Sequence, residues 1–82
     1  MHETAIAQNI ILILRRICEE NKLKTLERVH LRIGEWNFIQ ENTLRFAFAL
    51  LCREEGWGDV KLDIIWEKES GNLYIESVEG EI

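Results

Sequence analysis

The chain has few of the residues and motifs on which enzymes and nucleic-acid binders rely. Its 82 residues include two histidines and two cysteines, and they contain no Gly-rich phosphate loop, GxSxG elbow or HExxH motif. Ten Lys and Arg against 15 Asp and Glu give a formal net charge of −5. Neutralising nucleic-acid phosphates needs clustered cations, so this balance argues against a nucleic-acid partner. We therefore expect neither an enzyme nor a nucleic-acid-binding protein.

Long apolar runs and paired cysteines are missing as well. The apolar run of residues 10–14 ends at Arg15 and Arg16, far short of the ~20 residues that span a bilayer, and no secretory signal is present. Cys18 and Cys52 have no CxxC partner, and each falls in an expected helix, which favours buried, reduced thiols over a disulfide or a zinc site. We expect one small cytoplasmic domain, residues 1–82, without a membrane span.

The spacing of apolar residues predicts five elements in the order helix, strand, helix, strand, strand. Residues 4–21 have the three- and four-residue steps of an amphipathic helix, and a second helix is expected from Asn42 or Thr43 to about Glu55. Alternation predicts strands over 25–35, 60–68 and 73–78, with frayed residues at 79–82. The expected buried stripes are Ile6, Ile10, Ile13, Leu14 and Ile17 in the first helix and Leu44, Ala47, Phe48 and Leu51 in the second.

This order predicts an α+β fold with a small three-stranded mixed sheet and two helices on one face. A strand–helix–strand unit implies two parallel strands joined by a right-handed crossover. The short turn Ser70-Gly71-Asn72 is expected to add an antiparallel strand beside the second of them. The first strand should expose Arg28, His30 and Arg32, with His30 a surface residue. The outer face of the sheet is then left to solvent or to a partner.

The first three residues are the one place where metal-ligand chemistry assembles without help from the fold. The chain-terminal amine of Met1, the backbone nitrogen of His2 and the imidazole Nδ1 of His2 lie along one short covalent path. Such a nitrogen-rich, near-square set suits Ni(II) or Cu(II) better than Mg or Ca. Glu3 adds a carboxylate that would ligate axially or orient the imidazole. We expect this tripeptide to protrude from the helix start, tethered but not buried. The simpler interpretation, that His2 follows the starting Met by chance, stays open at this point.

Large aromatic side chains in the connecting segments have two interpretations. Trp36 and Phe38 lie in an expected loop, where they would either fill the core or anchor a partner protein. For Trp57, between two glycines, we expect a place in the core.

Four segments together carry a resemblance to a known family. They are Met1-His2-Glu3 followed by residues 5–7, the strand 29–35 (VHLRIGE), residues 44–48 (LRFAF) and residues 73–79 (LYIESVE). In this order they resemble the HypA/HybF hydrogenase nickel-incorporation proteins, over essentially all 82 residues. The resemblance implies a metallochaperone that binds Ni(II) through groups matching Met1, His2 and Glu3. It also implies delivery, with the maturation GTPase HypB, to the large subunit of [NiFe]-hydrogenase; some members serve urease maturation.

The chain departs from that family pattern at two places. Ordinary members carry a zinc domain with two CxxC pairs between the second and third strands. This chain has a turn at 68–72 in place of that domain, so we expect it to bind no zinc. A natural loss and an engineered removal of the zinc domain both fit this pattern. Some members also have an acidic ligand in the loop where this chain has Gln40, an amide, followed by Glu41. The alternative function is a metal-independent interaction module that uses the open sheet face and the Trp36–Phe38 loop.

Overall fold

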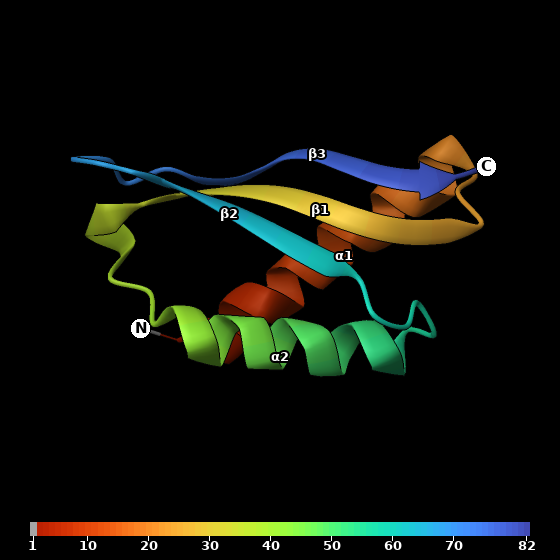
Figure 1. Ribbon diagram of the computed structural model, residues 1–82, viewed down its shortest axis with the longest axis horizontal. Coiled ribbons are helices and arrows are strands. Elements are labelled where there is room, and N and C mark those ends of the chain that lie inside the picture. The colour runs from red at the N-terminus through yellow and green to blue at the C-terminus, as the bar shows by residue number, and fades with distance from the viewer. Residues whose placement is uncertain (1) are drawn as a thin grey trace.

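The computed structural model describes residues 2–82 and has the predicted order of elements (Figure 1). Its α+β class, with a three-stranded mixed sheet and two helices, is confirmed. The C-terminal residues do not fray as expected, because the Lys24 N–H donates to the carbonyl of Glu81 at 2.6 Å and extends the last strand. The elements are α1 (Glu3–Asn21), β1 (Thr25–Gly34), a 3₁₀ turn η1 (Glu35–Asn37), α2 (Glu41–Glu54), β2 (Lys61–Glu67) and β3 (Leu73–Glu81).

The strand order is β2-β1-β3, with β1 in the centre. β1 runs parallel to β2, as expected, and antiparallel to β3. The expectation that β3 forms a hairpin beside β2 is wrong. The turn after β2 crosses the end of β1, where the Gly34 N–H donates to the carbonyl of Asn72 at 2.7 Å and the Trp36 N–H donates to that of Ser70 at 3.0 Å. β3 therefore lies on the side of β1 that faces away from β2.

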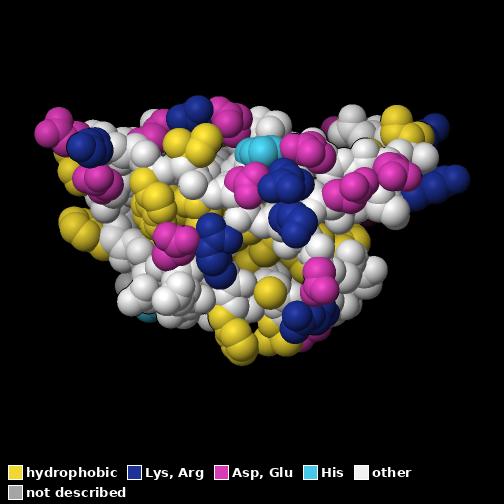
Figure 2. All heavy atoms as spheres, in the orientation of Figure 1, with side chains coloured by type: hydrophobic (Ala, Val, Ile, Leu, Met, Phe, Trp, Pro, Cys, Tyr) yellow, Lys and Arg dark blue, Asp and Glu magenta, His cyan; other side chains and the backbone are white. Residues whose placement is uncertain are grey.

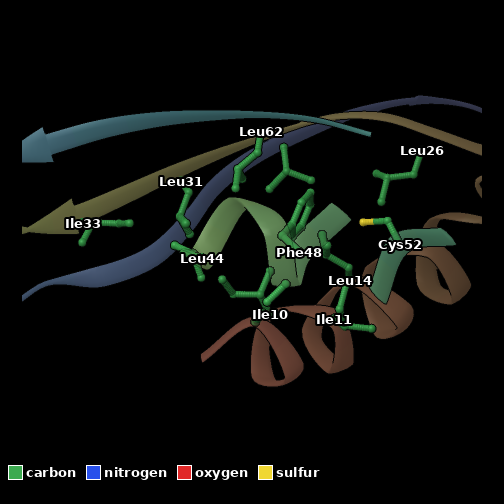
Figure 3. Close-up of a cluster of buried hydrophobic side chains, with 13 residues drawn as sticks. Ile10, Ile11, Leu14, Leu26, Leu31, Ile33, Leu44, Phe48, Cys52 and Leu62 are labelled. Carbon is green, nitrogen blue, oxygen red and sulfur yellow. The ribbon is translucent and has the colours of Figure 1, made fainter. Parts of the chain in front are cut away.

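Both helices cover the same face of the sheet and enclose one core (Figures 1 and 3). Within residues 2–82, neither helix is long and apolar enough to cross a membrane. The predicted stripe of α1 is partly wrong, because Ile13 is 51% exposed and Ala7 and Ile11 are buried instead. The core residues, with Trp57 packed against them as expected, are Ala7, Ile10, Ile11, Leu14, Leu26, Val29, Leu31, Ile33, Leu44, Ala47, Phe48, Cys52 and Leu62.

Ion pairs cover the outer face of the sheet. The predicted alternation of β1 is confirmed, since Val29, Leu31 and Ile33 are buried and the polar residues between them face outward. Arg28 pairs with Asp63 at 2.8 Å, His30 Nε2 with Glu79 at 2.6 Å, and Arg32 with Glu76 at 2.6 Å. Figure 2 shows a histidine among alternating acidic and basic side chains along the upper part of this view. The open sheet face is thus a ladder of charges rather than an apolar surface.

Candidate metal centre

The predicted metal ligand His2 is exposed and directly precedes α1. Its carbonyl accepts the first helical hydrogen bond, from the Ile6 N–H at 3.0 Å, while its imidazole makes no capping bond to the helix. The ring is therefore carried by a backbone that is fixed at the helix start. Met1, which carries the amine of the predicted site, lies outside the described residues.

Glu3 differs from expectation because its side chain is only 8% exposed. Its Oε2 accepts a hydrogen bond from the backbone N–H of Gln40 at 2.8 Å. This bond, given by a fixed amide to a carboxylate, holds the pKa of Glu3 below its usual value. The expectation that the whole tripeptide protrudes is therefore wrong for Glu3. The carboxylate ties the first turn of α1 to Gln40, the residue directly before α2.

A hollow next to this anchor gives solvent access to the helix starts. His2, Glu3 and Thr4 line it with Ala5, Gln8 and Thr43. Within residues 2–82, no three His, Cys, Asp or Glu side chains gather in a group that could hold a metal ion. A metal at His2 would then need its backbone nitrogen and the amine of Met1 as further donors.

The loop before α2 contacts Glu3 through a backbone N–H and not through a side chain. Gln40 uses its N–H toward Glu3, and its side chain is exposed. The neighbouring acid, Glu41, accepts a hydrogen bond from Arg45 Nε at 2.8 Å, and this bond lowers the pKa of its carboxyl group. The side chain of Trp66 on β2 also lowers the pKa of Glu41. Its carboxylate is thus engaged toward β2 and Arg45.

The two loop aromatics lie outside the core. Trp36 is 60% exposed and Phe38 is 77% exposed. Phe38 has a positive φ of 50°, an uncommon conformation for a residue with a large side chain. Asn37 holds this segment, since its Nδ2 donates to the carbonyls of Gly34 at 3.0 Å and Asn72 at 2.8 Å. The loop is thus tied to the end of β1 and to Asn72, and both of its aromatic residues are exposed.

Sequence reasoning missed the residues that hold these features in place. Gln40 acts through its backbone, which leaves no side-chain signal. Asn37 is an ordinary turn residue by pattern, and its partner at Asn72 became adjacent only through the unexpected strand order. An Arg15–Glu55 pair with two bonds of 2.6 Å also joins α1 to α2. No short motif links residues 40 positions apart.

Comparison with known proteins identifies the family. A family model described as "Hydrogenase/urease nickel incorporation, metallochaperone, hypA" matches residues 1–73. The chain belongs to the HypA family. The predicted resemblance is therefore confirmed, and the family is one of metallochaperones for nickel incorporation rather than of catalysts.

Relatives of this HypA-family chain are hydrogenase maturation factors. HypA of Crocosphaera subtropica is 34% identical over 71 residues, which is 87% of this chain and 60% of that protein. HypA of Archaeoglobus fulgidus is 34% identical over 68 residues, covering 83% and 62%. HybF of Escherichia coli is 33% identical over 52 residues, covering 63% and 46%. The chain thus spans only about half to three fifths of the length of these relatives.

A solved structure has the same fold. The solution structure of the Ni metallochaperone HypA from Helicobacter pylori superposes with a TM-score of 0.73 at 24% sequence identity. The match covers 94% of this chain and 72% of that one. The α-β-α-β-β arrangement is therefore that of a HypA-family protein.

Proposed function

We propose that this chain is a nickel metallochaperone that binds Ni(II) at its N-terminus and delivers it during [NiFe]-hydrogenase maturation. The ligands are the Met1 amine and the backbone nitrogen and imidazole of His2. One observation carries the proposal: His2 is exposed at the first turn of α1, while the neighbouring Glu3 fixes that turn to Gln40. Membership of the HypA family supports nickel as the cargo.

The contacts of Glu3 favour an anchoring role over axial ligation. One carboxylate oxygen already accepts the Gln40 N–H at 2.8 Å, and the side chain is almost fully enclosed. Glu3 would act by fixing the direction in which His2 leaves the helix. Nickel release would follow from reprotonation of the amide and of the terminal amine, whose unperturbed pKa is ~8. Nickel affinity is therefore expected to fall as the pH drops through neutrality.

The partners we propose are the maturation GTPase HypB and the hydrogenase large subunit, with Trp36 and Phe38 as contact residues. Both rings are exposed, and Phe38 lies two residues before the Gln40 amide that holds Glu3. Figure 1 draws η1 and the start of α1 in the same half of the molecule. A partner bound to these rings would thus lie near the start of α1, where we propose that nickel binds.

Calorimetric titration of the untagged protein with Ni(II) tests the nickel site. His2→Ala and an N-terminally extended form should both lose binding, because each removes a nitrogen donor or changes the terminal amine. His30→Ala is the matched control, since it removes the other imidazole, on the outer sheet face, and should bind like the unchanged protein. Equal binding by all four forms would rule out the N-terminal site.

The absence of four thiolates leads us to propose that residues 1–82 form one nickel-binding domain, with the turn near 68–72 in place of the family's zinc domain. Elemental analysis of the purified protein should then find no stoichiometric tetrahedral Zn(II). If no form binds nickel at micromolar metal, the alternative gains support: a metal-independent interaction module with the same fold. Loss of partner capture by Trp36→Ala and Phe38→Ala, with nickel absent, would favour that alternative.

A further inference from the structure

The two edge strands of the sheet, β2 and β3, differ in whether a side chain occupies their outer backbone groups. On β2, the Arg45 guanidinium donates to the carbonyl of Leu62 at 2.6 Å, and Glu41 holds Arg45 in place. A side chain that occupies an edge backbone group hinders pairing with another strand. On β3, within the described residues 2–82, no side chain bonds to the backbone between Leu73 and Gly80, and no strand pairs with the side away from β1. The β3 edge is therefore open to an added strand.

An apolar groove lies beside this open edge, between α1 and the first residues of β3. Ile6, Ile10 and Ile13 of α1 line one side, and Leu73 and Ile75 of β3 line the other. Its volume is about 140 Å³. An apolar cavity of about 150 Å³ holds a benzene ring, so the groove is large enough for one apolar side chain.

α1 has more apolar side chains than the core buries, since Leu12 and Ile13 remain exposed. The flank of α1 that faces α2 includes Leu12 and Arg15, which line a hollow together with Leu51 of α2. The opposite flank carries Ile6 and Ile13 toward β3, and Ile13 remains 51% exposed. Exposed apolar side chains beside an unpaired edge are typical of a binding site for an extended segment.

We propose that the β3 edge and this groove bind an extended, basic segment of another protein as an additional strand. An added strand lies about 4.8 Å beyond β3 and pairs with its backbone near Leu73–Ile75. Side chains on one face of that strand then enter the groove, and those on the other face meet the outer side of the sheet. There, Glu76 gives one oxygen to Arg32 at 2.6 Å and has a second oxygen for an incoming cation.

Charge selects a basic partner over a second copy of this chain. β3 contains three glutamates, Glu76, Glu79 and Glu81, and no Lys or Arg, and the whole chain has a formal net charge of −5. A second copy would bring its own three β3 glutamates and its own net charge of −5 to this edge, and like charges across a strand pair are destabilising. The bulge between the His30 and Leu31 pairings also limits the straight stretch of β3 to its first residues. A short Lys-containing strand fits this edge.

A labelled nine-residue peptide of alternating Val and Lys serves as the probe, with fluorescence anisotropy on metal-free protein as the readout. We expect saturable binding that Ile13→Lys weakens at least tenfold, because the substitution puts a cation in the groove. Leu12→Lys is the matched control: Leu12 is 56% exposed on the other flank of the same helix, and the change should alter the affinity less than twofold. The same peptide with alternate backbone nitrogens methylated on its pairing edge should not bind.

Four outcomes would overturn the proposal. They are no binding of the Val-Lys peptide, equal effects of the two substitutions, undiminished binding of the methylated peptide, and a dimer in sedimentation that Ile13→Lys dissociates. The last result would make a second copy the occupant. Nickel titration of Ile13→Lys should be unchanged, so this test and the test of the N-terminal site fail or succeed separately.

Discussion

Replacing Gly34 with alanine should loosen the turn that follows β2 and, with it, the segment that presents Trp36. An added Cβ at Gly34 would lie 2.1 Å from the carbonyl oxygen of Ser70 and 2.9 Å from the nitrogen of Asn72. Ordinary van der Waals contacts of a Cβ are 3.4–4 Å. Both clashing groups are backbone, so no side chain can rotate away, and the turn must retreat by more than about 1 Å.

The size of the effect follows from the bonds that this retreat would break. The Gly34 N–H donates to the carbonyl of Asn72 at 2.7 Å, the Trp36 N–H to that of Ser70 at 3.0 Å, and Asn37 Nδ2 to that of Asn72 at 2.8 Å. At about 1 kcal/mol each, the free energy of unfolding should fall by about 3 kcal/mol. For a domain of this size, that is a decrease in Tm of roughly 12–24 °C.

Urea unfolding followed by tryptophan fluorescence measures this difference, and Gly71→Ala is the matched control. Gly71 lies in the same turn, and an added Cβ there meets nothing within 4 Å. Its free energy of unfolding should stay within about 0.5 kcal/mol of the unchanged protein. If the two variants unfold within about 1 kcal/mol of each other, the turn is not tied to β1 in the way described.

Two further predictions concern pH and thiol chemistry. Because the Gln40 N–H lowers the pKa of Glu3 below the ordinary 4.5, ionised Glu3 should stabilise the fold fully above that value and lose its contribution as the pH falls through the lowered pKa. The difference in unfolding free energy between the protein and Glu3→Gln should therefore shrink on acidification below 4.5; a constant difference down to acid unfolding would contradict it. Burial raises the pKa of Cys52 to about 12, so iodoacetamide should label the half-buried Cys18 first and Cys52 only on unfolding, as mass spectrometry can follow. Equal labelling rates in the native protein would refute this.

Periodicity predicted the element types because each apolar pattern has one matching geometry. β1 alternates from Val29 to Ile33, and its Val29, Leu31 and Ile33 all lie in the core. The α1 stripe was harder to predict, because apolar residues cover more than one face of that helix. Which of Ile11 and Ile13 is buried depends on where α2 lies, and a single-helix pattern carries no such information.

Strand order and the candidate site depended on contacts that leave no local trace. A short turn between strands favours a hairpin. Here Gly34 has no side chain, so the turn packs against the end of β1, and β3 pairs with β1 instead of β2. From the sequence, Glu3 is expected to be an exposed carboxylate in the first turn of α1. Its partner is the backbone amide of Gln40, 37 residues further along the chain. The family resemblance named His2 as a ligand, and the fold added only its exposure at the helix start.

The position of β1 between two strands that come much later in the chain has a consequence for folding. Val29 pairs with Leu62, 33 residues on, and Thr25 pairs with Glu81, 56 residues on. No local hairpin can template this sheet, so loop-closure entropy opposes pairing until distant segments meet. We expect α1 and α2 to form early and the sheet late. During synthesis both backbone edges of β1 therefore remain unpaired until the two later strands have left the ribosome.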